Sequence, residues 1–195
     1  MSENVIKSAL EIALEKAKNI KVSDKELERI KYIEEGKKIA GQYLVKEKYN
    51  INSVLKSYKE VSKKYILESI ESVFLSNIVL PKTKTAKKEI RKALEGMVSI
   101  KENKQLALQI CGEIDQLLDN YRKYVEENYR HLKKEFQAQF EDTRKAVENQ
   151  LGIKVKVEVE SNPEFQRQWR EIISQIDSQY TSVLEEYKQR LKSIR

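Results

Sequence analysis

The chain has 195 residues, a net charge of +7, 35% charged and 39% hydrophobic side chains, and only 5 Gly and 2 Pro. Because loop-rich domains use more glycine and proline, this composition predicts an elongated, all-α protein with much surface and little core. It excludes a membrane span, since no apolar run reaches the length that a bilayer requires, and the regular apolar spacing argues against disorder.

The net positive charge comes from the first half of the chain. Residues 1–100 hold 21 basic and 14 acidic residues, whereas residues 101–195 hold 17 of each. This asymmetry predicts two modules, a basic helical bundle over 1–100 and a long helical hairpin over 101–195. The abundance of Lys, Glu and Ile favours a thermophilic source.

The single cysteine indicates in which cellular compartment the protein works. Cys111 cannot form an internal disulfide, which suits a reducing cytoplasm. It lies in the apolar helical stretch LALQICGEIDQLL, so we expect an inert core thiol. Acidic residues interrupt the apolar stretch at the N-terminus, so we expect no signal peptide and a cytoplasmic protein.

Three amphipathic segments follow one another from the N-terminus. Apolar residues at helical spacing predict helices over about 3–18, 24–48 and 53–79. Ser23 opens the second helix with the capping box Ser-Asp-Lys-Glu. Pro81 ends the third, because the residue before a proline is pushed out of the helical region.

A basic run accompanies the start of a short fourth helix. Thr83 or Thr85 is the predicted cap of this helix, and Gly96 is its predicted end. N–H groups at a helix N-terminus favour anions, so the run is a candidate contact for nucleic-acid phosphate or for an acidic partner. The alternative is a solvated basic turn in a lysine-rich protein. The run consists of Lys82, Lys84, Lys87, Lys88, Arg91 and Lys92, against Glu89 alone.

The second half of the chain repeats one apolar spacing along a helix predicted over 102–151. Its apolar residues step by 3, 4 and 4, which is an eleven-residue repeat that runs nearly straight or slightly right-handed. The helix would be about 75 Å long at about 1.5 Å per residue. This first seam consists of Leu118, Tyr121, Val125, Tyr129, Leu132, Phe136, Phe140, Thr143, Val147 and Leu151.

A second seam of the same period ends the chain. Asn162 is a good N-cap, and Pro163 suits the first helical position that follows it. Two seams of equal period, separated by about ten residues, predict an antiparallel helical hairpin in which the aromatic residues serve core packing. The second seam consists of Phe165, Trp169, Ile172, Ile176, Tyr180, Val183, Tyr187 and Leu191.

The connector between the seams has a different period. Residues 152–161 read GIKVKVEVES, and this strict alternation predicts one short strand. An open strand edge invites pairing, either with residues 19–22 or 97–100 or with a second copy. Antiparallel pairing with a second copy would set lysines opposite glutamates, so we predict a dimer contact. The residues assigned to it are Ile153, Val155, Val157 and Val159.

The sequence predicts no catalytic residue, no metal site and no cofactor. His131 shares a helix face with Glu127 and Glu135, but no second histidine exists, so we expect an exposed, charge-paired side chain. The stretch GKKIAG lacks the Lys-Ser/Thr pair that must follow a phosphate loop. Its glycines, Gly36 and Gly41, either weaken the second helix or allow close helix packing.

Three stretches together resemble a family of uncharacterised bacterial helical proteins: IKSALEIALEKAK, VLPKTKTAKKEIRKALEGM and NPEFQRQWREIISQIDSQYTSVLEEYKQRL. The resemblance covers most of the chain and implies no activity. The eleven-residue coils are also similar to those of peripheral-stalk subunits of rotary ATPases. Here, however, the long coil lies in the middle of the chain and a full seam follows the strand, which departs from the stalk pattern.

These observations predict a non-enzymatic structural or adaptor protein. We expect it to self-associate as a dimer, or to bind another helical protein, because aromatic-rich seams offer more apolar surface than one thin hairpin hides. The alternatives are a nucleic-acid-binding protein that uses the run from Lys82 to Lys92, and an accessory subunit of a rotary ATPase.

Overall fold

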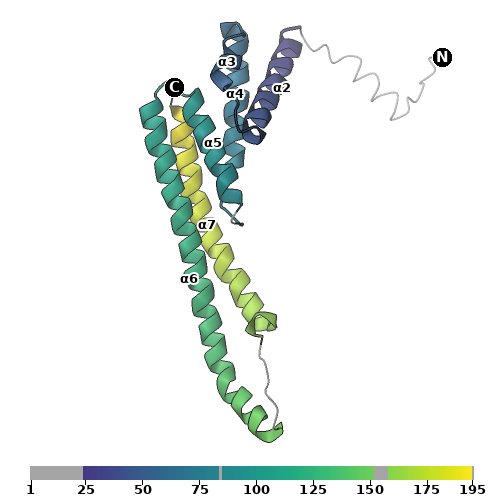
Figure 1. The fold of residues 1–195 in the computed structure, drawn as a ribbon, viewed down its shortest axis with the longest axis vertical. Coiled ribbons are helices and arrows are strands. Elements are labelled where there is room, and N and C mark those ends of the chain that lie inside the picture. Colours follow the sequence, from purple (N-terminus) through teal and green to yellow (C-terminus); the bar gives the residue numbers. More distant parts are fainter. Residues whose placement is uncertain (1–23, 84, 152–157, 195) are drawn as a thin grey trace, which may run out of the picture.

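The computed structural model describes residues 24–83, 85–151 and 158–194, and every regular element in these ranges is helical. The all-α prediction is confirmed for these residues, whereas the predicted helix 3–18 and residues 152–157 of the predicted strand lie outside them. Figure 1 shows an elongated molecule. The elements are α2 (Asp24–Val45), α3 (Ile51–Leu55), α4 (Glu60–Asn77), α5 (Ala86–Ile100), α6 (Lys104–Leu151), the 3-10 helix η1 (Val159–Ser161) and α7 (Pro163–Ser193).

Helices α2 and α4 pack side by side and run in the same direction. The guanidinium of Arg29 lies 5.6 Å from the ring centre of Tyr65 near their first turns. Further along both helices, the rings of Tyr43 and Phe74 pack with centres 5.3 Å apart. Because the contact positions rise together in the two helices, the helices are parallel. The segment that contains α3 connects the end of α2 to the start of α4.

The predicted helix 53–79 is in fact two helices, α3 and α4, with a turn between them. The side chain of Asn50 caps α3 by accepting a hydrogen bond from the backbone N–H of Ser53 at 3.1 Å. In the turn, the hydroxyl of Tyr58 donates to the carboxylate of Glu35 on α2 at 3.2 Å. The break in the helix therefore places Tyr58 against α2, and the apolar spacing of the sequence does not predict this contact.

Gly96 does not end the fourth helix, since α5 continues to Ile100. A β-carbon at Gly96 would lie 2.6 Å from the ring of Phe74 and 2.9 Å from the ring of Tyr43. The glycine thus lets α2 and α4 approach α5 closely. A C-terminal cap and a packing glycine look the same in the sequence, and only the neighbouring helices distinguish them.

Helices α6 and α7 form the predicted antiparallel hairpin (Figure 1). The rings of Tyr121 and Tyr180 pack with centres 5.4 Å apart, and those of Tyr129 and Trp169 with centres 5.0 Å apart. Early residues of α6 thus meet late residues of α7. Among the seam side chains that the structure describes, one prediction is wrong: Val183 is 39% exposed, and its neighbour Leu184, at 2%, takes the buried place.

The apolar core crosses the boundary predicted near residue 100. One cluster of buried side chains extends from Ile39 on α2 to Ile194 after α7, and includes residues of α4, α5 and α6. A second cluster lies further along the hairpin and consists of Leu132, Phe136, Val159 and Phe165. The hairpin is therefore built into the bundle at one end and has its own small core at the other.

No helix in the described part of the chain is both long enough and apolar enough to cross a membrane.

Candidate functional site

The basic run on α5 and the loop before it is largely occupied by contacts within the chain. Three of its cations pair with aspartates of the hairpin, and we call these three pairs the ionic clamp. The clamp ties the loop and α5 to both α6 and α7. Its pairs are Lys82 with Asp177, Lys87 with Asp119, and Arg91 with Asp115.

The pair of Arg91 and Asp115 has the most specific geometry in the clamp. Arg91 donates from Nε and Nη2 to the two carboxylate oxygens of Asp115, at 3.1 and 2.8 Å. A two-pronged contact of this kind is stronger than a single hydrogen bond between neutral groups. These hydrogen bonds from Arg91 hold the pKa of the Asp115 carboxyl below its ordinary value, although partial burial opposes the shift.

The remaining basic residues of the run have different surroundings. The ammonium of Lys92 lies 4.6 Å from the ring centre of Tyr43, a cation–π contact. Lys88 is exposed and makes no ion pair with any residue that the structure describes. Lys84 lies outside the described residues. One of the five described cations of the run is thus without a contact of its own.

A groove of about 670 Å³ lies between the end of α2 and α5, beside this run. Its walls include the cations that the clamp does not use, together with the exposed Val45. Acidic residues of the same walls match these cations in number, and the two clamp cations that also line the groove, Lys87 and Arg91, pair with aspartates of α6. The two sets are Lys46, Lys88 and Lys92 against Glu47, Glu89 and Glu95.

The clamp gives a testable pair of variants, Arg91→Gln and Lys88→Gln. In Arg91→Gln we expect the pKa of Asp115 to rise toward its ordinary value of 3.8 and the protein to melt earlier at neutral pH. A lowered pKa in the folded state stabilises the protein above about pH 4, and this contribution is lost as the pH falls toward the folded pKa. The variant should therefore lose part of the acid dependence of stability.

The measurements are a carbon-13 NMR titration of the Asp115 carboxyl and thermal melts between pH 2 and 7. Lys88→Gln removes the same charge from the same helix, and we expect it to leave the Asp115 titration and the thermal melts unchanged. An Asp115 titration that is the same in Arg91→Gln and in the natural protein would contradict the clamp.

Asp177 joins the clamp to the seam of the hairpin. The hydroxyl of Tyr121 donates to Asp177 Oδ1 at 2.7 Å, and Lys82 contacts the other oxygen. Burial, and then the hydrogen bond to this carboxylate, raises the pKa of Tyr121, so the phenol keeps its proton. A hollow of about 400 Å³ adjoins this group, with Pro81 and Trp169 among its lining residues.

Lys101 is a buried cation that the sequence does not reveal. It follows α5, and its ammonium pairs with Glu71 of α4. The same ammonium donates to the backbone carbonyls of Ile194 at 2.7 Å and Lys192 at 3.2 Å. Lys101 thus joins α4, α5 and the end of α7, and a lysine in a charged stretch gives no sign of such a role.

The residues considered for catalysis or metal binding have ordinary surroundings. His131 is exposed, as expected, and its Nδ1 lies 3.6 Å from a carboxylate oxygen of Glu135 one turn away. Cys111 is buried, and burial raises the pKa of its thiol to about 11, so the thiolate is scarce at neutral pH. Within the described ranges, no three His, Cys, Asp or Glu residues are grouped to hold a metal ion.

The last residues of the predicted strand form a 3-10 helix. Val159 opens the 3-10 helix η1 and is only 2% exposed, in the second apolar cluster with Phe136 and Phe165. Its assignment to a dimer contact is therefore wrong: the side chain is a core residue of the hairpin. The other three residues of the proposed contact, Ile153, Val155 and Val157, lie outside the described residues.

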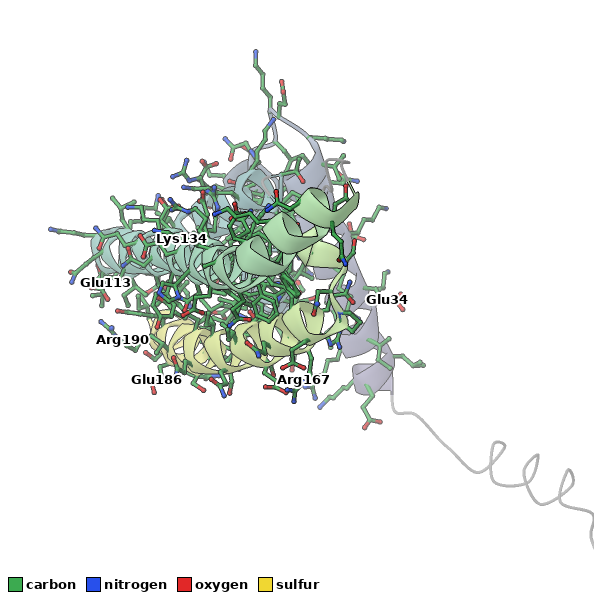
Figure 2. All side chains as sticks on the ribbon, turned by 90° about the horizontal axis from the view of Figure 1, so that it is seen from below. Glu34, Glu113, Lys134, Arg167, Glu186 and Arg190 are labelled. Carbon is green, nitrogen blue, oxygen red and sulfur yellow. The ribbon has the colours of Figure 1, made fainter. Side chains whose placement is uncertain are left out.

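The start of α7 has the predicted cap. The side-chain oxygen of Asn162 accepts hydrogen bonds from the backbone N–H groups of Glu164 and Phe165, at 2.8 and 3.1 Å. Glu164 in turn pairs with Arg167, and hydrogen bonds from Arg167 and Gln168 lower its pKa to about 2. Figure 2 shows Arg167 on the outer side of the hairpin. Near the C-terminal end of α7, Arg190 pairs with Glu113 of α6.

The fold defines an all-α protein in which a small bundle and an elongated antiparallel hairpin share one core. The chain belongs to the family of unknown function DUF6657, whose model matches residues 52–193. This match confirms the resemblance to an uncharacterised helical family. Comparison with the curated proteins and with the solved structures finds no match.

Proposed function

We propose that this protein is a non-enzymatic structural or adaptor protein that associates with itself and presents its hairpin to a helical partner. The observation that carries the proposal is the hairpin of α6 and α7, which extends well beyond the end of the bundle (Figure 1). Its distal part is filled by its own cluster of aromatic residues. Such an extended arm suits a spacer or a docking surface.

The surface of the hairpin and the clamp add support. Leu108, Tyr124 and Val183 of the hairpin are 64%, 45% and 39% exposed, and contact with a partner would bury them. The basic run supports this proposal over nucleic-acid binding, because three of its cations already neutralise aspartates of the same chain. Phosphates would have to displace these internal partners.

Light scattering during gel filtration tests self-association. We expect the mass of a dimer for the natural protein and the mass of a monomer for Val157→Pro, because proline removes a donor from the proposed strand pairing. Circular dichroism should show unchanged helicity in the variant. Val45→Gln, at the end of α2 and outside the hairpin, is the comparison, because Val45 is 84% exposed, and it should remain dimeric.

A strict monomer of the natural protein at high concentration would contradict self-association. A dimer that persists in Val157→Pro would contradict the strand as its contact and would direct attention to the exposed residues of the hairpin.

A further inference from the structure

The groove between α6 and α7 is covered by a third element along only part of the hairpin. Two pairs of the clamp hold the start of α5 and the loop before it on this groove: Lys87 contacts Asp119 of α6, and Lys82 contacts Asp177 of α7. Beyond the first turn of α5 the hairpin continues without a third helix (Figure 1). The same faces of α6 and α7 therefore lose their cover at this point.

The hollow of about 400 Å³ beside Asp177 lies at this point. On α6 it is lined by residues 122, 125, 126 and 129, and on α7 by residues 169 and 173, which lie two turns and one turn before Asp177. Residues three or four apart share one helix face, so each helix lines the hollow with a single face. We call it the aromatic hollow, and its apolar lining residues are Pro81, Tyr121, Val125, Tyr129, Trp169 and Ile173.

The walls of the aromatic hollow are packed against one another. The rings of Tyr129 and Trp169 meet edge to face with centres 5.0 Å apart, and both side chains are half-buried. Ile173 is half-buried as well but belongs to neither apolar cluster, so its side chain borders the hollow and not the core. Pockets for small ligands have volumes of about 300–1,000 Å³ and mostly apolar walls, and the hollow agrees with both.

Arg122 is the one charged residue of this lining that has no ion pair within the described part of the chain. Lys82 is neutralised by Asp177. Glu126 lies 4.0 Å from Arg130. Arg122 is half-buried and makes no side-chain hydrogen bond or ion pair with any described residue. Its guanidinium therefore offers a fork of free donors, which matches the geometry of a carboxylate.

We propose that the aromatic hollow binds a small aromatic carboxylate, with the ring against Trp169 and Ile173 and the carboxylate on the guanidinium of Arg122. Flat rings pack well against aromatic side chains, and a carboxylate supplies the negative charge that Arg122 lacks and binds it with two hydrogen bonds. A cation would be repelled by Arg122, and a neutral ligand would leave it unpaired. The inference is independent of the proposed structural function, because a monomer would bind the same ligand.

The fluorescence of Trp169, the single tryptophan, reports binding when the full chain is titrated with benzoate. We expect a saturable change in emission. Benzamide has the same ring without the charge and should bind about tenfold more weakly, because hydrogen bonds to charged groups are the stronger ones. Arg122→Gln should weaken benzoate by about the same factor and leave benzamide unchanged. Ile173→Ala, which removes part of the apolar wall, should weaken both ligands.

Lys123→Gln is the matched control. It removes a positive charge from the next residue of α6, but Lys123 is exposed and does not line the hollow, so the affinity for benzoate should stay the same. Circular dichroism melts show that each variant is folded. The proposal is overturned if neither fluorescence nor ligand-observed NMR detects saturable binding of benzoate, or if benzamide binds as tightly. It is also overturned if Arg122→Gln binds benzoate as Lys123→Gln does, or if Ile173→Ala weakens neither ligand.

Discussion

Replacing Gly36 with alanine is expected to destabilise the protein by about 3 kcal/mol, since overpacking a tight contact costs about 1–3 kcal/mol or more. A β-carbon at Gly36 would lie 2.6 Å from the backbone carbonyl oxygen of Ile66 and 2.7 Å from the β-carbon of Ser69. Neither atom can swing away, because Ile66 is fully buried and the Ser69 hydroxyl bonds the Ile33 carbonyl at 2.7 Å. Helices α2 and α4 would have to move apart.

Gly41 provides a matched control in the same helix. A β-carbon at Gly41 would meet no atom within 4 Å. Alanine is the better helix former by about 0.5–1 kcal/mol, so Gly41→Ala should stabilise the protein by that amount. Urea unfolding of the two variants followed by circular dichroism gives both values. A Gly36→Ala variant that is as stable as Gly41→Ala would show that α2 and α4 are not in this close contact.

The two glycines show where sequence reasoning stops. The sequence predicts that each either weakens the helix or permits close packing, and both readings apply, one to each glycine. What separates Gly36 from Gly41 is the position of α4. That position depends on contacts across 30 or more residues, such as the hydrogen bond from Ser69 to Ile33, and no local pattern records them.

The hairpin could be predicted because its pattern is local and long. Buried and half-buried residues recur at helical spacing along α6, among them Leu118, Leu132 and Phe136, so the spacing itself reports which side faces α7. The prediction loses its register near the end of α7, where Leu184 is buried and Val183 is exposed. There the end of α7 also contacts Lys101, which follows α5. A helix that packs against two neighbours buries residues on more than one side, so its buried residues no longer follow a single spacing.

The role of the basic run could not be predicted for a related reason. Counting charges from Lys82 to Lys92 gives an excess of cations, but the aspartates that neutralise them lie far away in the sequence. Arg91 and its partner Asp115 are 24 residues apart, and Lys82 and Asp177 are 95 apart. Only the packing of α5 against the hairpin brings these charges together. A charge run therefore predicts a binding surface only where the fold leaves it unpaired.

The side chain of Lys101 is expected to have the largest single effect on stability. Lys101→Met removes the cation but keeps most of the volume, and it leaves the carboxylate of Glu71 without its partner in a largely buried position, with 17% of its side chain exposed. Breaking one side of a buried ion pair costs about 3–5 kcal/mol. The carbonyl oxygens of Lys192 and Ile194 also lose their donor, so the end of α7 should separate first.

Two comparisons make the Lys101 result specific. The double variant Lys101→Met/Glu71→Leu removes the stranded carboxylate, and we expect it to be more stable than the single variant, since apolar pairs often replace buried ion pairs without loss. Lys63→Met breaks the exposed pair with Glu60 and should cost less than about 1 kcal/mol. Urea unfolding measures all three, and hydrogen exchange locates the opening. A single variant no less stable than Lys63→Met would show that the end of α7 is held by its apolar residues alone, with Leu191 at 0% exposure as the main contact.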